Sequence, residues 1–387
     1  MENGVFKKEE LERYSRHLIL PKFGIEGQQK LKHTKVLVIG SGGLGAPLLL
    51  YLAAAGIGKI GIVDFDVVDD SNLQRQVLFT VDDVGKPKVE VAKKRLEALN
   101  PHIQIEAFNE RLASDNVERI FKSYDIVADG TDNFPTRYLI NDACYFYGKV
   151  NVSASIFRFE GQVSVYNYLN EDGSRGPNYR DLYPEPPPPG LVPSCAEGGV
   201  IGVLPGIIGS LQANEVIKVA ANIGEPLVGK LLVFDALTLD SRVFKFEKNK
   251  DNPVSGTNPS INELIDYEAH CGIIKTEKKS TEVKEKSVEE LKKMKDGQED
   301  FQLIDVREQH EYDIVNIDGK LIPLGDILQH ASEISREKPV IVHCRSGVRS
   351  ATAIAQLEKE FGFENLYNLK GGVLAYADEI DPSLPKY

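Results

Sequence analysis

The run GSGGLG at positions 40–45 has the residue types and spacing of a phosphate-binding turn. It satisfies the pattern G-x-G-x-x-G, and its glycines are Gly40, Gly42, Gly43 and Gly45. Glycines let the backbone approach a phosphate, and the N-terminus of a following helix favours negative charge. The acid that accompanies this pattern is Asp64, about 20 residues further on. Alone, the pattern predicts an adenosine-containing ligand, and an NAD-dependent dehydrogenase is the default class.

Basic and amide side chains after this turn change that interpretation. They are Asn72, Arg75 and Gln76 in SNLQRQ, Lys88 after GKP, and Asn133 in DGTDN, a run that also contains the acid Asp132. Cations around a glycine cradle offset the charge that develops when a triphosphate is attacked, whereas nicotinamide chemistry needs no such cluster. Each residue taken singly is an ordinary surface group, but the set in this order favours ATP.

The loop CRSGVRS at positions 344–350 is a second candidate site. It follows an apolar strand and opens a helix, so its backbone N–H groups form an anion nest that stabilises a thiolate or persulfide on Cys344. The rest of this persulfide loop is Arg345, Ser346, Gly347, Val348 and Arg349. The alternative is a protein phosphatase, which uses C-x5-R. The spacing here is C-x4-R, and the shorter loop favours sulfur over phosphate.

The other cysteines are Cys144, Cys195 and Cys271. Cys195 follows a proline-rich stretch and precedes glycines and a helix, a setting that favours an exposed, reactive thiolate; a small buried residue at a helix start is the alternative. Cys144 lies in an apolar helical pattern and is predicted to be core. No C-x-x-C pair occurs, so the spacing predicts neither a disulfide framework nor a metal site.

We expect alternating strands and helices to position these residues. Strands are predicted at 35–40, 59–64, 103–108 and 125–129, with helices at 46–55 and 87–99, which indicates a Rossmann-like, doubly wound α/β sheet. Longer antiparallel strands are predicted at 161–168 and 230–244, with a helix at 200–221 between them.

A Lys- and Glu-rich segment separates this domain from a second one. We predict a first domain at 1–272, a charged linker at 273–286 and a smaller α/β domain at 287–387. Ser287 and Glu290 form a capping-box pattern that opens the second domain. Strands at 301–306, 339–343 and 366–369 and a helix at 348–361 complete it.

Bulk composition narrows the function classes. The 387 residues are 42% hydrophobic, with a net charge of −12 and no run of 18 apolar residues. This argues against nucleic acid as a partner and against a membrane span. The N-terminus lacks a signal-peptide core, so we expect a cytoplasmic protein.

The motifs of the first domain resemble the MoeB/ThiF family, relatives of the ubiquitin-activating enzymes. The similarity runs over residues 10–272 and includes an RYSR opening at 13–16. It implies that ATP and Mg²⁺ are used to activate, as an acyl-adenylate, the C-terminal glycine of a small ubiquitin-like carrier protein ending in Gly-Gly. It further implies that Asp64 holds the ribose, that Asn72, Arg75 and Lys88 hold phosphates, with Gln76 and Asn133 beside them, and that Asp132 coordinates Mg²⁺. Arg16 would reach the ATP site of a partner subunit, which implies a homodimer.

The second domain resembles rhodaneses. DVRE at 305–308 and GGVLA at 371–375 match that family in addition to the Cys344 loop. The two resemblances together imply that a sulfur donor such as a cysteine desulfurase loads Cys344, and that the persulfide converts the activated carrier to a thiocarboxylate. Cys195 resembles the loop cysteine that forms a covalent intermediate in some MoeB/ThiF members.

The chain departs from that family at its zinc site. Many members bind zinc with two C-x-x-C pairs, which here fall at Asn178, Asp181, Asn252 and Ser255. These residues supply no thiolates, so we predict no zinc and expect hydrogen bonds or packing to hold the region instead.

Several readings stay open at this point. The resemblance leans toward molybdopterin synthesis, with tRNA thiolation or thiamin synthesis as alternatives. Other classes are an NAD-dependent oxidoreductase fused to a sulfurtransferase, an activator that conjugates its carrier to proteins, and a scaffold with degenerate sites. Complete motifs at both sites count against the scaffold.

Overall fold

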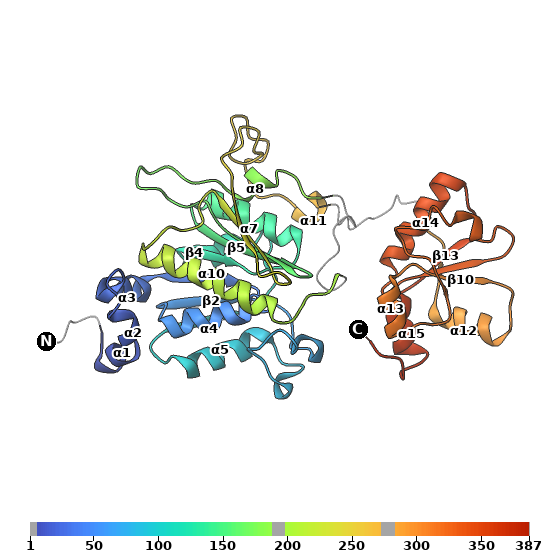
Figure 1. The fold of residues 1–387 in the computed structure, drawn as a ribbon, viewed down its shortest axis with the longest axis horizontal. Helices are drawn as coiled ribbons and strands as arrows, with labels where there is room; N and C mark the ends of the chain where they lie inside the picture. The colour runs from blue at the N-terminus through green and yellow to red at the C-terminus, as the bar shows by residue number, and fades with distance from the viewer. Residues whose placement is uncertain (1–5, 188–197, 272–282, 387) are drawn as a thin grey trace. The chain divides into compact units, whose positions relative to one another are not determined.

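The computed structural model describes residues 6–187, 198–271 and 283–386, which divide into two units, residues 1–274 and 275–387 (Figure 1). Each unit has its own sheet, and each is described separately below. Across these described ranges, no helix is at once long and apolar enough to cross a membrane.

The sheet of the first unit has the strand order β3-β2-β1-β4-β5-β6-β7-β8. Its strands are β1 (Lys35–Ile39), β2 (Lys59–Val63), β3 (Gln104–Phe108), β4 (Ile126–Asp129), β5 (Val150–Phe157), β6 (Glu160–Tyr166), β7 (Lys230–Asp235) and β8 (Ser241–Lys245). The first five strands in this order pair in parallel, and the last three are added antiparallel. The predicted α/β class is therefore confirmed, with an antiparallel extension at one edge.

Helices cover both faces of this sheet. They are α1 (Lys8–Arg13), α2 (Ser15–Leu18), α3 (Gly24–His33), α4 (Gly45–Ala55), α5 (Lys88–Leu99), α6 (Val117–Phe121), α7 (Phe134–Phe146), α8 (Tyr179–Leu182), α10 (Leu204–Ala221) and α11 (Tyr267–His270), with short 3-10 turns at Asp70–Asn72 and Val81–Asp83. Successive side chains of a strand point to opposite faces. In β1, Val36 and Val38 join the core formed with α4, α5 and α10, whereas Leu37 and Ile39 join the core formed with α6 and α7. A strand buried on both faces explains the continuous apolar run of β1.

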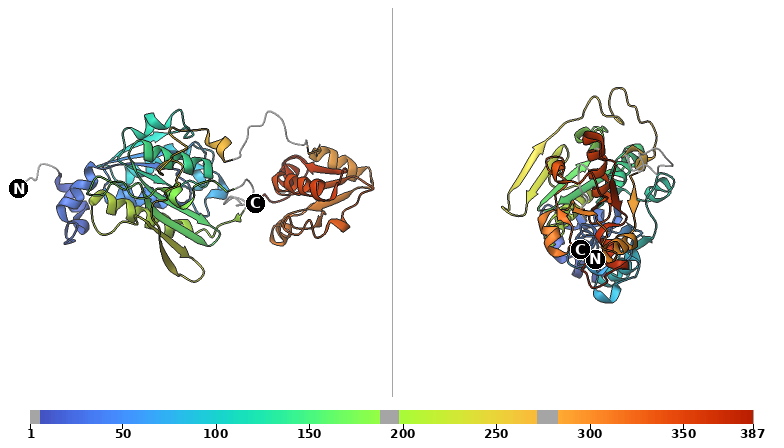
Figure 2. Two further views of the ribbon diagram at one scale, coloured as in Figure 1. Left: turned by 90° about the horizontal axis from the view of Figure 1, so that it is seen from above. Right: turned by 90° about the vertical axis from the view of Figure 1, so that its right-hand side faces the viewer.

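Two features of this sheet differ from the sequence prediction. The segment predicted as one strand at 230–244 is a hairpin of β7 and β8 with exposed β8 residues, and it extends from the sheet edge (Figure 2). Strand β5 was not predicted, although its alternation of Val150, Val152 and Ala154 with polar residues is a strand pattern.

The second unit has a parallel sheet in the order β11-β10-β12-β13-β9. Its strands are β9 (Glu285–Lys286), β10 (Gln302–Asp305), β11 (Lys320–Leu321), β12 (Val340–His343) and β13 (Leu366–Leu369), and its helices are α12 (Val288–Asp296), α13 (Gln309–Ile314), α14 (Val348–Phe361) and α15 (Gly372–Glu379), with a 3-10 turn at Ala331–Glu333. The capping box of Ser287 and Glu290 is present at the start of α12. The charged linker was predicted to run to residue 286. Its last two residues, Glu285 and Lys286, instead form strand β9 and pair with β13.

Candidate active sites

The glycine turn lies at the carboxyl end of β1, where the strand order reverses between β1 and β4. Ligands of open α/β sheets bind at such a switch point. The turn is sterically closed: Gly40 has φ +88°, and a Cβ on Gly45 would lie 2.0 Å from the Gly40 carbonyl oxygen. On the other side, a Cβ on Gly43 would lie 3.2 Å from the Pro205 Cβ at the start of α10. Glycine is therefore required here by close backbone approach.

Asp64 is fixed against this turn from the end of β2. Its Oδ2 accepts hydrogen bonds of 2.8 Å from both the backbone N–H and the hydroxyl of Ser41, and its Oδ1 accepts one from Asp66 N–H at 3.0 Å. The carboxylate is partly exposed beside the turn. This position suits an acid that accepts hydrogen bonds from a ribose.

The predicted basic and amide residues gather on the same side. Gln76 is buried, and a Cβ on Gly42 would lie 3.4 Å from its Nε2. Gln76 Oε1 has no hydrogen-bond partner among the described atoms. Arg75 packs beside Gly43 and donates to the Ser71 carbonyl at 3.1 Å. Asn72 lies one turn earlier, where its Oδ1 accepts from Asp69 N–H at 3.4 Å.

Lys88 begins α5 and is 5% exposed. Its Nζ lies 3.1 Å from Asp66 Oδ2, so a carboxylate that the sequence analysis did not assign holds this cation in place. Asp66 lies in the run DFD at 64–66. Its pairing with Lys88, 22 positions further along the chain, cannot be seen in a local sequence pattern.

Asp132 and Asn133 follow β4 in the same region. Asp132 is exposed, whereas Asn133 Oδ1 accepts from Thr136 N–H at 3.0 Å and caps α7. Among the residues that the structure describes, no three His, Cys, Asp or Glu side chains gather into a metal-binding group. Mg²⁺ needs no such group, because it keeps several waters and binds through one or two carboxylates together with substrate phosphates. Asp132 fits that limited role.

The two remaining residues predicted for the first unit are Arg16 and Cys195. Arg16 is exposed in α2 and has no hydrogen-bond or ion-pair partner within the described ranges; the exposed Ile19 and Leu20 follow it. Cys195 lies outside the described residues.

The other two cysteines of the first unit are buried. Cys144 is fully buried in α7, as predicted, and burial raises the pKa of its thiol well above the ordinary value. Burial likewise raises the pKa of Cys271 to about 11. A thiol protonated at neutral pH is a poor nucleophile.

In the second unit, Cys344 follows β12 and its sulfur is enclosed by its own loop. Cys344 is 0% exposed, Gly347 N–H donates to its Sγ at 3.1 Å, and the Ser350 hydroxyl lies 3.4 Å from it. Gly347 has φ +93° and is the N-cap of α14. The backbone therefore turns an N–H toward the sulfur at a helix N-terminus, an arrangement that favours an anion.

The glycine pair at 371–372 begins helix α15, and this helix supports the Cys344 loop through backbone hydrogen bonds. Val373 N–H donates to the Cys344 carbonyl at 3.0 Å, and Leu374 N–H donates to the Arg345 carbonyl at 3.1 Å. A Cβ on Gly372 would lie 2.4 Å from the Cys344 carbonyl oxygen. The motif at 371–375 thus has a physical reason: only glycine lets α15 dock on the loop.

Arg349 pairs with a carboxylate of the neighbouring helix α13. Its Nη1 and Nη2 each lie 2.7 Å from a carboxylate oxygen of Glu311, which is 4% exposed. Such a bidentate pair fixes the guanidinium on α13. Glu311 was not identified from the sequence.

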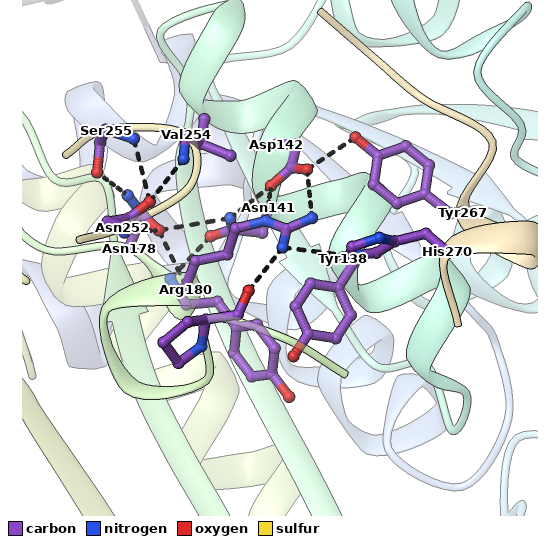
Figure 3. A network of polar contacts seen from close by, with 12 residues as sticks. Tyr138, Asn141, Asp142, Asn178, Arg180, Asn252, Val254, Ser255, Tyr267 and His270 are labelled. Atoms are coloured by element: carbon purple, nitrogen blue, oxygen red, sulfur yellow. Dashed lines mark hydrogen bonds and ion pairs between the residues drawn. The ribbon is translucent and has the colours of Figure 1, made fainter. Parts of the chain in front are cut away.

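Of the four positions where the family has zinc ligands, Asn178, Asn252 and Ser255 lie together in Figure 3, and a hydrogen bond joins Asp181 to Asn252. Asn252 Nδ2 donates to Asp181 Oδ1 at 2.7 Å and to Asn178 Oδ1 at 3.1 Å, and Asn178 Nδ2 donates to Ser255 Oγ at 2.8 Å. Asn252 Oδ1 also accepts from the backbone N–H groups of Val254 and Ser255. We call Asn178, Asp181, Asn252 and Ser255 the polar box; its hydrogen bonds are those the sequence analysis expected to replace metal coordination.

A buried ion pair adjoins the polar box (Figure 3). Arg180 is fully buried and donates to Asp142 through Nε at 2.8 Å and Nη2 at 2.9 Å. The Tyr267 hydroxyl donates to Asp142 at 2.8 Å. This network attaches α8 and α11 to α7, so the end of the first unit is tied to its core by hydrogen bonds.

Comparison with known proteins agrees with this geometry. Residues 14–255 match the ThiF family, and residues 287–379 match the rhodanese-like domain. The chain is 48% identical over 389 residues, 99% of its length and 97% of the relative, to a probable adenylyltransferase/sulfurtransferase MoeZ of Mycobacterium tuberculosis. It is 54% identical over 266 residues, 69% of the chain and 98% of the relative, to a sulfur carrier protein adenylyltransferase of Thermus thermophilus.

Among solved structures, Escherichia coli MccB with ATP is similar, with a TM-score of 0.54 and 24% identity. The match covers 62% of this chain and 74% of MccB. At this identity the likeness supports the fold of the first unit.

Proposed function

This chain belongs to the ThiF family and carries a rhodanese-like domain after it, and we propose that it adenylates the C-terminal glycine of a ubiquitin-like sulfur-carrier protein and supplies sulfur to it from Cys344. The observation that carries the proposal is the presence, in one chain, of an ATP-type glycine turn with gathered cations and of a cysteine enclosed by an anion-binding loop. Relatives named for both activities match nearly the whole chain.

The first step is nucleotidyl transfer. A carboxylate oxygen of the carrier attacks the α-phosphorus of ATP, the bond to the β-phosphate oxygen breaks, and pyrophosphate leaves with the electron pair. Arg75 and Lys88 offset charge on the phosphates, Asp64 binds the ribose, and Gln76 with its unpartnered Oε1 lines the turn. Asp132 would hold Mg²⁺, which offsets further phosphate charge when bound.

The second step is sulfur transfer. The Cys344 thiolate takes sulfane sulfur from a donor such as a cysteine desulfurase and becomes a persulfide. The terminal sulfur attacks the acyl carbon, AMP leaves, and an acyl disulfide remains on Cys344. A thiol, either Cys195 or an external reductant, attacks the sulfur of Cys344, so that the carrier leaves as a thiocarboxylate. A further thiol then reduces the resulting disulfide.

Arg16 provides the argument for a homodimer. It is an exposed cation without a partner within the described ranges and lies beside exposed Ile19 and Leu20. We propose that it completes the ATP site of a second subunit. The free thiols Cys144, Cys271 and Cys344 support action in the cytoplasm, where thiols stay reduced. The expected pathway is molybdopterin synthesis, with tRNA thiolation or thiamin synthesis as alternatives.

Carrier-dependent exchange of labelled pyrophosphate into ATP tests this function. Wild-type chain is assayed with a panel of carriers ending in Gly-Gly, in parallel with Arg75→Ala. Arg119→Ala, which removes an exposed arginine of the same unit, is the matched control. Exchange with one carrier, lost only in Arg75→Ala, supports the proposal and identifies the pathway. Absence of exchange with every carrier, despite ATP binding, contradicts it.

A further inference from the structure

A buried serine lies next to the sulfur of Cys344, and a buried asparagine lies next to the serine. Ser350 is in the first turn of α14 and Asn368 is on β13; the two are 0% and 5% exposed. The Ser350 Oγ lies 3.4 Å from Cys344 Sγ and 2.7 Å from Asn368 Oδ1. One hydroxyl is thus shared between the reacting sulfur and an amide, and neither Ser350 nor Asn368 has a role in the function proposed above.

The protons on the Ser350 hydroxyl and on the Cys344 sulfur determine which hydrogen bonds can form here. A serine hydroxyl carries one proton and accepts through two lone pairs. When Cys344 is a thiol, Ser350 donates to Asn368 Oδ1 and accepts from the S–H group. When the sulfur is a thiolate or a persulfide, it has no such proton, and the Ser350 proton is best placed on the sulfur. Asn368 then satisfies Ser350 only by presenting Nδ2 as a donor.

A rotation of the Asn368 amide group exchanges these roles. Its oxygen and nitrogen occupy nearly equivalent places, so which one faces Ser350 follows from the hydrogen bonds available rather than from shape. The rotation needs no backbone movement. The pair can therefore accompany Cys344 through both charge states of its reaction.

Several charged and titratable groups surround the loop. Arg349 is paired with Glu311 from α13, and Arg345 lies on the loop itself. At the end of the neighbouring strand, Asp305 pairs with Arg307. Burial lowers the pKa of His343 to about 4, so its ring is neutral at physiological pH. Gly347 N–H and the Ser350 hydroxyl are two neutral donors within hydrogen-bond distance of the sulfur, at 3.1 and 3.4 Å.

We propose that Ser350 and Asn368 form a hydrogen-bond switch that stabilises the sulfur anion of Cys344. Ser350 acts as a catalytic residue that donates to Sγ, and Asn368 acts as a positioning residue that accepts from Ser350 in one state and donates to it in the other. In a turnover with thiosulfate, Cys344 thiolate attacks the sulfane sulfur and sulfite leaves; cyanide then takes that sulfur and regenerates the thiolate. The switch stabilises the Cys344 thiolate before it takes up the sulfane sulfur and again when cyanide removes that sulfur. The inference rests on the proposed sulfurtransferase function.

The test uses the full chain and two readouts. The first is the pH profile of iodoacetamide alkylation at Cys344, read by mass spectrometry of its peptide. The second is the kcat and KM of thiosulfate–cyanide transfer. The variants are Ser350→Ala, Ser350→Thr, Asn368→Asp, which only accepts when ionised, and the control Thr352→Ala, an exposed residue on the same helix.

We expect Ser350→Ala and Asn368→Asp to move the alkylation midpoint up by about 1 pH unit and to lower kcat about tenfold, because a hydrogen bond to a charged group is lost. KM changes little, Ser350→Thr stays near wild type, and Thr352→Ala matches wild type. An unchanged midpoint in both Ser350→Ala and Asn368→Asp overturns the inference, and Asn368→Asp decides alone where Ser350→Ala does not fold. A wild-type chain without thiosulfate activity contradicts the sulfurtransferase proposal instead, since alkylation still reports on the switch.

Discussion

The nucleotide site and the Cys344 loop differ in how far the chain completes each of them. At Cys344, the donors to the sulfur come from the loop itself and from α14, and the thiol is fully buried among them. At the glycine turn, the cations stand on separate elements and Asp132 is exposed. The sulfur of Cys344 is therefore enclosed by its own loop and helix, whereas the groups around the glycine turn come from several elements and leave Asp132 open to solvent.

This contrast has a physical basis. A sulfur anion is small and needs a few fixed donors, which one loop at a helix N-terminus can supply. A triphosphate carries several charges, so its site needs groups from several strands and helices. The predictions below test the contrast from its strongest expected effect to its weakest.

The largest expected effect is in the sulfur loop. Gly372→Ala places a Cβ 2.4 Å from the Cys344 carbonyl oxygen, so α15 or the loop must shift. A displacement of about 1 Å at reacting groups lowers rates about a hundredfold. We expect thiosulfate–cyanide transfer to fall by about that factor while carrier-dependent pyrophosphate exchange is unchanged.

Gly362→Ala is the matched control for this change. Gly362 also has a positive φ, +64° against +59° for Gly372, but a Cβ there meets nothing within 4 Å. Equal losses in the two variants would attribute the effect to backbone strain and not to the fit against the loop.

The first unit is expected to depend on its polar box for stability. Asn252→Ala removes two donated bonds and leaves Asp181 and Asn178 with fewer partners in a buried site. We expect the free energy of unfolding of this unit to fall by about 2 kcal/mol. Pulse proteolysis in urea, read on a gel, measures it, with Asn170→Ala at an exposed turn as the control.

A chelator is the complementary test of the polar box. Wild-type chain is expected to keep its unfolding midpoint in excess EDTA, because hydrogen bonds occupy the positions of the usual thiolates. A lower midpoint with chelator, restored by zinc, would show that the region binds metal after all.

Acid is expected to destabilise the second unit through His343. His343 is fully buried with a pKa lowered to about 4, and desolvation of the charged ring is the main cause. The unfolded chain binds this proton near pH 6.5 and the folded chain does not, so stability is full above pH 6.5 and is lost as pH falls toward 4. We expect the second unit to lose about 2 kcal/mol between pH 6.5 and 4.5. A His343→Gln variant with the same slope in pulse proteolysis would assign the acid sensitivity elsewhere.

The smallest expected effect is at the nucleotide site. Asp66→Asn removes the counter-ion of the buried Lys88, and Nζ loses its anchor. We expect the KM for ATP in pyrophosphate exchange to rise about tenfold, as for loss of one charged hydrogen bond. Asp70→Asn, at an exposed neighbouring position, serves as the control and should leave KM unchanged.

What the sequence revealed depended on whether a feature is local. The glycine turn, helix α14 and strand β13 follow from short patterns of glycine and apolar spacing, and their bounds agree with prediction within a residue or so. The hairpin of β7 and β8 was missed because its turn at 236–240 contains no Gly, Pro or Asn, and Leu239 takes a positive φ of 63°. No local rule predicts that conformation for leucine.

Contacts in the sites between segments that are distant in the sequence could not be predicted either. Glu311 on Arg349, Asp66 on Lys88 and Gly372 on the Cys344 carbonyl each join residues that are brought together only by the folded sheets. The sequence therefore predicted which residues carry the chemistry, and the structure shows the partners that hold several of them.

The most direct test of the account is whether both sites act in sequence on one carrier. A carrier that supports pyrophosphate exchange is incubated with ATP, a sulfane donor and a thiol reductant, and its mass is measured with wild-type chain and with Cys344→Ser. We predict that both proteins exchange pyrophosphate equally. Only with the wild-type chain should the carrier gain the mass expected when sulfur replaces one oxygen of its terminal carboxylate. Thiocarboxylate formation at the wild-type rate by Cys344→Ser would contradict the central claim.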